Sequence, residues 1–131
     1  QLFNQKCASC HAGILFSDFS FRNNGLTTGS DLGRFRVSVI TTDSFKFKVP
    51  SLRNVEKSSP YIHDDRFTTQ EEILDHYASG VVKTNTTLDT ILQQDGTLGI
   101  PMTNEEKNKI ILFLKTLTDT KMLSDTRFSE Q

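Results

Sequence analysis

The segment Cys7-Ala8-Ser9-Cys10-His11 restricts what this chain can fold into more than any other part of the sequence. Two thiols three positions apart on a helical turn, followed at once by a histidine, form the C-x-x-C-H pattern that attaches haem c. The thiols would form thioether bonds with the two vinyl groups of the porphyrin, and the imidazole would bind the iron. We therefore expect one covalent haem, held by Cys7 and Cys10 with His11 as the proximal ligand.

Two other interpretations of the cysteine pair have less support in the sequence. A thioredoxin-like redox pair would need a preceding strand and a βαβ context, whereas this pair follows a polar helical start. A zinc site would need a third and a fourth ligand at tight spacing, and His63 and His76 lie far away in the sequence. Haem attachment is the interpretation we favour.

The composition is compatible with a single domain over residues 1–131, with a surface tail from about residue 120. Hydrophobic residues make up 35% of the chain, which is a little low, and a large prosthetic group would supply some of the missing apolar surface. The net charge of −1 gives no argument for a nucleic-acid or anionic-membrane partner. No apolar stretch reaches the roughly 18 residues of a membrane span, and no signal peptide is visible. The chain looks like a mature or trimmed piece.

The hydrophobic pattern predicts a mainly α fold with long loops. A short helix is expected over residues 1–10, another over 87–94, and a half-buried strand over 34–40, where polar and apolar residues alternate. A first and a last helix that cross beside the haem would give a cytochrome c-type fold around one covalent haem, with a short pair of β-strands.

Two helices carry clear start signals. Thr68 and Glu71 have the spacing of a capping box, and this helix should end at Gly80. Thr103 and Glu106 form a second box at the start of the last helix. The apolar stripe of that last helix is Ile110, Phe113, Leu114 and Leu117.

Four segments carry a family resemblance, and they follow one another in the family's order. They are Phe47–Val55 (FKVPSLRNV), Pro60–Phe67 (PYIHDDRF), Glu71–Tyr77 (EEILDHY) and Phe113–Asp119 (FLKTLTD). Together they resemble the carboxy-terminal domain of bacterial di-haem cytochrome c peroxidases and their relatives of the MauG type. The resemblance covers nearly the whole chain. One departure is Asp65, where a glycine is common.

The resemblance implies an electron-transfer role. The family has two haem domains in one chain, and the amino-terminal half, which carries the peroxide-reducing haem, has no counterpart here. The expected partners are that peroxidatic domain, a small electron donor such as a cytochrome c or a cupredoxin, and a second copy in a homodimer. The expected location is the periplasm or another exported compartment. The alternatives are a stand-alone monohaem electron carrier and a ligand-sensing haem domain.

The resemblance also suggests the second axial ligand. The family's ligand lies six residues after the first acidic residue of the Glu-Glu pair, which leads from Glu71 to Tyr77, and a tyrosine ligates the iron there in MauG-type relatives. The helical spacing agrees, because Tyr77 shares a face with Ile73 and Leu74 and should point inward. The rival is Met102, although it directly precedes the N-cap Thr103 and core packing suits it better.

The other possible iron ligands have less support in the sequence. His63 is expected to play a structural part near the haem, His76 to be a solvated or interface histidine, and Met122 to lie on the surface of the tail. Asp64 and Asp65 are expected to be solvated or helix-capping charges rather than metal ligands.

Three further residues have expected binding roles. Arg53 could pair with a haem propionate, since a buried carboxylate needs a charge-assisted donor. By resemblance, backbone carbonyls of Ser58 and Pro60 would contribute to a calcium ion between the two haem domains. Carbonyl oxygens suit calcium, but the side-chain ligand would come from the other domain.

Overall fold

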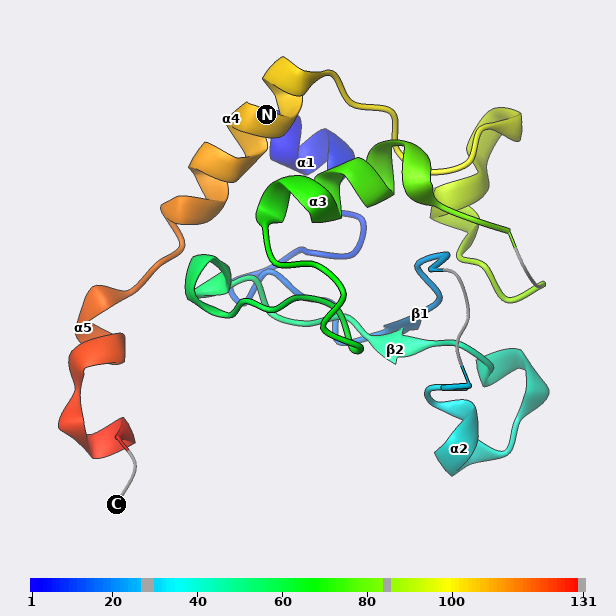
Figure 1. Cartoon of the computed structure of the whole chain (residues 1–131), viewed down its shortest axis with the longest axis horizontal. Helices are drawn as coiled ribbons and strands as arrows, with labels where there is room; N and C mark the ends of the chain where they lie inside the picture. Colours follow the sequence, from blue (N-terminus) through cyan, green and yellow to red (C-terminus); the bar gives the residue numbers. More distant parts are fainter. Residues whose placement is uncertain (27–29, 84–85, 130–131) are drawn as a thin grey trace.

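The structure is a computed structural model that describes residues 1–26, 30–83 and 86–129. Its α-helices are α1 (Leu2–Lys6), α2 (Phe35–Ser38), α3 (Gln70–Asp75), α4 (Asn104–Lys115) and α5 (Thr120–Ser124). Its strands are β1 (Phe21–Arg22) and β2 (Phe47–Lys48). Shorter helical turns cover Thr41–Asp43, Val55–Lys57, His76–Gly80, Thr90–Gly96 and Thr126–Phe128. Figure 1 shows α1, α3 and α4 together on one side of the molecule and the small sheet on the other.

The main core lies where α1, α3 and α4 meet. Both α1 and α3 pack against α4, so the expected contact between the first and last helices is confirmed. The fully buried side chain at the centre is Ile110, which is 1% exposed. The buried residues of this cluster are Phe3, Leu74, Ile110, Ile111, Leu114 and Leu117. A helix as short as α1 is stable only because this packing holds it.

The caps of the two longer helices differ in how well the sequence predicted them. The box of Thr103 and Glu106 is present as expected at the start of α4. The box at the start of α3 lies one residue later than predicted, because Thr69 is the N-cap and Glu72 is its partner. Beyond Asp75 the chain continues as a wider π-helical turn and stops at Gly80, the predicted end. The helix expected over 87–94 is a 3-10 turn over Thr90–Gly96.

The sheet is antiparallel and pairs Phe21 with Lys48 and Arg22 with Phe47. A short pair of strands was expected, but with a strand at residues 34–40 rather than at these positions. The strand predicted over 34–40 is wrong, since Phe35–Ser38 forms α2. Val37 and Val39 are 88% and 74% exposed, so the alternating pattern buries no face that would favour a strand.

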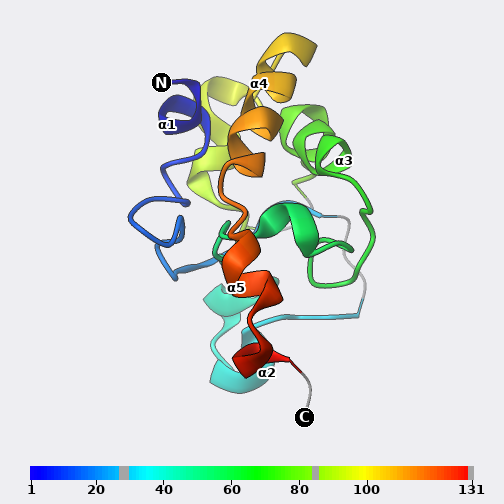
Figure 2. The ribbon, with the colours of Figure 1, turned by 90° about the vertical axis from the view of Figure 1, so that its left-hand side faces the viewer.

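Residues 120–129 are mostly exposed and partly helical. The Asp119 side chain caps α5, and Asp125 caps the turn that follows. Figure 2 shows these turns leading away from α4. Within the described residues, no helix combines the length and the apolar character that crossing a bilayer requires.

Candidate haem site

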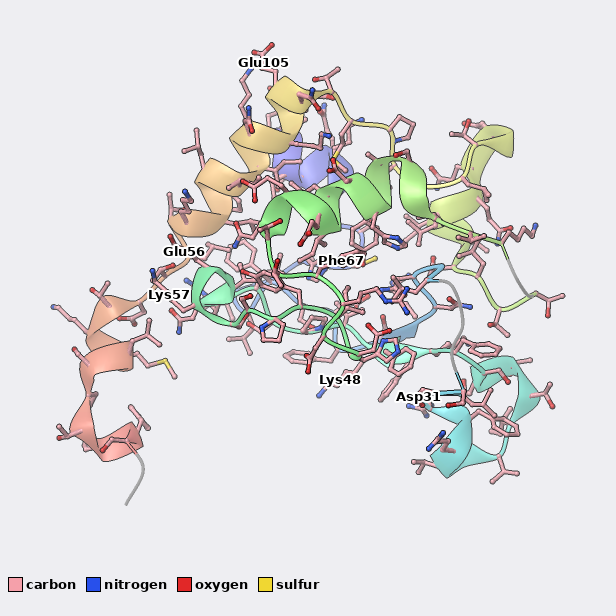
Figure 3. All side chains as sticks on the ribbon, viewed as in Figure 1. Asp31, Lys48, Glu56, Lys57, Phe67 and Glu105 are labelled. Carbon is pink, nitrogen blue, oxygen red and sulfur yellow. The ribbon has the colours of Figure 1, made fainter. Side chains whose placement is uncertain are left out.

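A large cavity lies between the α1–α3–α4 core and the segment that contains β2. Its empty volume is about 1110 Å³ when the open mouth is included. Its walls are mostly apolar, and the sequence-predicted site residues that line it are Cys7, Cys10, His11, Tyr77 and Met102. Figure 3 shows Lys48, another residue of the wall, on the β2 side of the molecule. The fold thus brings the attachment motif and both proposed distal ligands to one space.

The two thiols are free and half-buried at the end of α1. Burial raises the pKa of Cys7 to about 11, and the nearby Cys10 adds to this. Burial also raises the pKa of Cys10, against the hydrogen bond from Ser9. Redox-active cysteine pairs instead have a lowered thiol pKa, because the thiolate is the reactive form. The environment therefore argues against a thioredoxin-like role.

A zinc site also finds no support in the part of the chain that the structure describes. Within residues 1–26, 30–83 and 86–129, no three or more His, Cys, Asp or Glu side chains gather as a set of metal ligands.

His11 is oriented by the main chain. Its Nδ1 lies 3.0 Å from the carbonyl oxygen of Phe16. Burial lowers the pKa of His11, while the Phe16 and Pro50 carbonyls oppose that shift. A neutral imidazole that donates from Nδ1 keeps the lone pair of Nε2 for a metal, which is the tautomer an iron ligand needs.

Tyr77 reaches the cavity from a stripe of α3 and its π-helical extension. Gln70, Ile73, Leu74 and Tyr77 all line the cavity, at the i, i+3, i+4, i+7 spacing of one helix face. The capping box of Thr69 and Glu72 fixes where this face begins.

Asn24 and His76 support Tyr77. Burial raises the pKa of the Tyr77 hydroxyl, and a hydrogen bond with the Asn24 side chain opposes this. The Nε2 of His76 lies 2.9 Å from the Asn24 carbonyl oxygen, and its ring packs edge-on against Tyr77 at 5.4 Å. The expectation of a solvated or interface His76 is wrong, because this side chain is buried at 7% exposure. His76 is not among the residues that line the cavity, whereas its neighbour Tyr77 is.

Gln70 has a buried amide without a partner in the described residues. The residue is 7% exposed, and neither Nε2 nor Oε1 has a hydrogen bond within residues 1–26, 30–83 and 86–129. An unpaired buried amide costs about 1–3 kcal/mol, so a cavity-lining amide of this kind points to a group that brings polar atoms into the space. Haem is such a group, an apolar ring with two carboxylates. The cavity, the thiol pair with its imidazole, and this amide all fit haem c.

Arg22 lines the cavity near Cys10. Its Nη2 lies 2.7 Å from an Asp18 carboxylate oxygen and its Nη1 lies 2.8 Å from Asp89. Sequence reasoning missed Arg22, Asn24 and Gln70. Of these three, only Gln70 could have been recognised in the sequence, because it is a polar residue on the same helix face as Ile73, Leu74 and Tyr77.

Arg53 lies outside the cavity wall. Its Nε and Nη2 both donate to the carbonyl oxygen of Ile14, at 3.0 and 2.8 Å. Its guanidinium also lies 5.1 Å from the centre of the Phe16 ring. The structure therefore gives Arg53 a main-chain partner beside the attachment motif, and its contact with a haem propionate stays a prediction.

The remaining candidates lie at the surface. The exposed His63 stacks on Phe47, a residue of the cavity wall, with 3.5 Å between ring centres. Met122 is 50% exposed. Ser58 and Pro60 are exposed on the loop before Tyr61.

Met102 and Asp64 have defined surroundings. Met102 packs against the main core as well as lining the cavity. Asp64 forms an ion pair with Arg66, which fits the expectation of a surface charge.

Comparison with known proteins places this geometry in a family. No family model matches the chain. The methylamine utilization protein MauG of Methylorubrum extorquens is 36% identical over 113 residues, which is 85% of this chain and 30% of MauG. The cytochrome c551 peroxidase of Nitrosomonas europaea is 31% identical over 117 residues, 86% of this chain and 30% of the peroxidase. The cytochrome c peroxidase Ccp of Escherichia coli is 42% identical over 72 residues, 48% of this chain and 16% of Ccp.

A solved structure agrees with these sequence matches. It is a MauG-like protein associated with microbial copper homeostasis, with a TM-score of 0.79 and 28% identity, covering 98% of this chain and 48% of that protein. The chain spans less than half the length of each of these relatives. By sequence and by fold, it belongs to the family of MauG and the bacterial di-haem cytochrome c peroxidases, whose names imply haem c as the cofactor.

Proposed function

We propose that this chain is the electron-transfer haem domain of a di-haem oxidoreductase and carries one covalent haem c. The single observation that carries the proposal is the shared cavity. The attachment motif of Cys7, Cys10 and His11 lines the same apolar space as Tyr77, although the motif follows α1 and Tyr77 follows α3.

Each side chain has a role in this proposal. Bound haem c supplies an iron that takes up and releases one electron. Cys7 and Cys10 would hold the porphyrin through thioether bonds, and the Nε2 of His11 would ligate the iron. Tyr77 would supply the second axial ligand, with Met102 as the alternative. A ligand carried on a packed helix keeps its position without a covering loop.

In the intact enzyme this domain would pass electrons between a small donor protein and a peroxidatic haem that reduces hydrogen peroxide. The partner haem domain would lie in the part of the relatives that this chain does not match. The same proposal predicts a calcium ion between the two domains, with the Ser58 and Pro60 carbonyls as ligands. It also predicts an exported or periplasmic location. A homodimer is a further prediction.

A second candidate is a stand-alone monohaem carrier without catalysis of its own. This sequence holds one C-x-x-C-H motif, and both candidates require that one motif in this domain. A second such motif encoded upstream of Gln1 would decide for the di-haem enzyme. A haem-based sensor would instead show a high-spin ferric spectrum, because its sixth position must be open.

The test uses the purified, haem-loaded chain. We expect a ferric spectrum without a dominant high-spin component, slow binding of cyanide, and negligible peroxide turnover with a reduced electron donor. Peroxide reduction needs a vacant position at the iron with acid–base groups beside it. Rapid cyanide binding together with sustained turnover would overturn the electron-transfer assignment.

A further inference from the structure

Three consecutive carbonyl groups in the loop after the attachment motif are each engaged by a side chain. The Ile14 oxygen accepts two hydrogen bonds from Arg53, at 3.0 and 2.8 Å. The Leu15 oxygen accepts one from the Ser51 hydroxyl at 2.6 Å. The next oxygen, that of Phe16, is the partner of His11 at 3.0 Å. The segment at Ser51 and Arg53 thus holds the two residues that precede the partner of the proximal histidine.

This loop is held by its own backbone hydrogen bonds and also by side chains from outside it. The amides of Phe16 and Ser17 donate to the carbonyl oxygens of Gly13 and Ala12, at 3.1 and 3.0 Å. Phe16 has a φ of 52°, in the left-handed region, which costs a residue with a side chain about 1–2 kcal/mol. The Phe16 ring is packed among three side chains. The Arg53 guanidinium lies 5.1 Å from its centre, and the rings of Phe3 and Phe113 lie 5.7 and 5.9 Å away. These contacts restrict the Phe16 ring and so add to the restraint on the direction of the Phe16 carbonyl.

We propose that Ser51 and Arg53 are positioning residues that fix the Phe16 carbonyl on His11 Nδ1 and thereby set how strongly His11 donates to the iron. The inference rests on the proposed function, since it takes His11 to be the proximal ligand. It goes beyond that function by assigning to two residues outside the cavity wall control over the reduction potential of the haem.

The direction of the effect follows from the hydrogen bond. A histidine that donates from Nδ1 gains negative character on its ring and becomes a stronger ligand. A stronger donor stabilises ferric iron relative to ferrous iron and lowers the reduction potential. Loss of the two anchors should weaken this hydrogen bond and raise the potential.

The test compares haem-loaded Ser51→Ala, Arg53→Lys and the double variant. None of them changes the net charge, so a shift in potential cannot come from a lost charge. The matched controls are Ser124→Ala and Arg36→Lys, which also alter side chains that donate to main-chain carbonyls, of Lys121 and Ser30, but lie outside the cavity and the loop. The readouts are the reduction potential and the solvent exchange of the His11 Nδ1 proton, followed by NMR of the ferric domain.

We expect the double variant to retain its haem, to have a higher potential, and to exchange the Nδ1 proton about tenfold faster, the factor that one lost hydrogen bond supports. If the double variant does not mature, Ser51→Ala alone decides by the same readouts. Unchanged exchange and potential in haem-loaded variants, or equal changes in the controls, would overturn the inference. A wild-type chain that carries no haem would instead refute the proposed function.

Discussion

His11 and Tyr77 line one cavity, the first from the loop that follows α1 and the second from the π-helical turn that follows α3. The two side chains are the pair that a six-coordinate haem iron would need, and neither depends on the other's element for its orientation. His11 is held by the Phe16 carbonyl, and Tyr77 contacts the Asn24 side chain.

Tyr77→Phe tests the distal ligand. The substitution removes the hydroxyl and keeps the ring, so the domain should still fold, with a loss of about 1 kcal/mol for the hydrogen bond to Asn24. An anionic oxygen ligand favours ferric iron, so the reduction potential should rise and cyanide should begin to bind quickly. Spectra and a redox titration measure both effects. If Tyr77→Phe changes neither while Met102→Leu changes both, Met102 is the ligand.

Asp18→Asn should make the domain less stable and less sensitive to acid. Burial alone would raise the pKa of Asp18, but hydrogen bonds from Arg22 and Ser20 outweigh it and lower the pKa from 3.8 to about 2. A lowered folded-state pKa gives stability that is present above the unfolded value and lost as the pH falls toward 2.

The expected loss for Asp18→Asn at neutral pH is about 1 kcal/mol, because solvent screens part of this ion pair. Urea unfolding at a series of pH values should show a flatter profile between about pH 4 and 2. The exposed Asp95→Asn is the control. An unchanged pH slope for Asp18→Asn would contradict the assignment.

Asp65→Gly should be tolerated or slightly stabilising. Asp65 has a φ of 57°, the left-handed conformation that glycine adopts without a steric penalty, which explains why the family often has glycine at this position. Asp65→Val should lower the free energy of unfolding by about 1–2 kcal/mol, since a branched side chain is strained there. Thermal unfolding of both variants measures this. A valine variant as stable as the glycine variant would argue against a left-handed residue 65.

Thr69→Ala should destabilise the helix that carries Tyr77. The Thr69 hydroxyl accepts a hydrogen bond from the Glu72 amide at 3.2 Å, and loss of an N-cap of this type costs about 1 kcal/mol. Thr68→Ala is the neighbouring control, because its hydroxyl donates to the Glu72 carboxylate at 3.2 Å but accepts no amide of the helix, so its loss should be smaller. Equal losses in chemical unfolding would show that Thr69 is not the cap.

The parts of the fold that could be predicted from sequence are those with local signals. The capping box at Thr103 and the apolar stripe through Ile110 locate α4, because both depend on spacing within one helix. The segment 34–40 could not be predicted, since its alternation buries nothing and its backbone instead forms local turns that end with Val39 in the left-handed region. Strands of two residues, such as β1, are too short to leave a pattern.

The site residues likewise divide into those that a local sequence pattern predicts and those that only the tertiary structure reveals. Cys7, Cys10 and His11 are visible because their chemistry requires adjacent positions. The partner of Arg53 is a main-chain carbonyl, Ile14 O, and no pattern of side chains reveals such a contact. Asn24 reaches Tyr77 from a distant loop, so its role depends on tertiary structure alone.

The intact mass of the denatured chain tests the central claim most directly. The chain should be produced in an exported form in a host that attaches haem c, then unfolded and extracted with acidified acetone to remove haem that is not covalently bound. We predict the polypeptide mass plus one haem, and loss of that addition when both Cys7 and Cys10 are replaced by alanine. A colourless chain with the bare polypeptide mass would contradict the account.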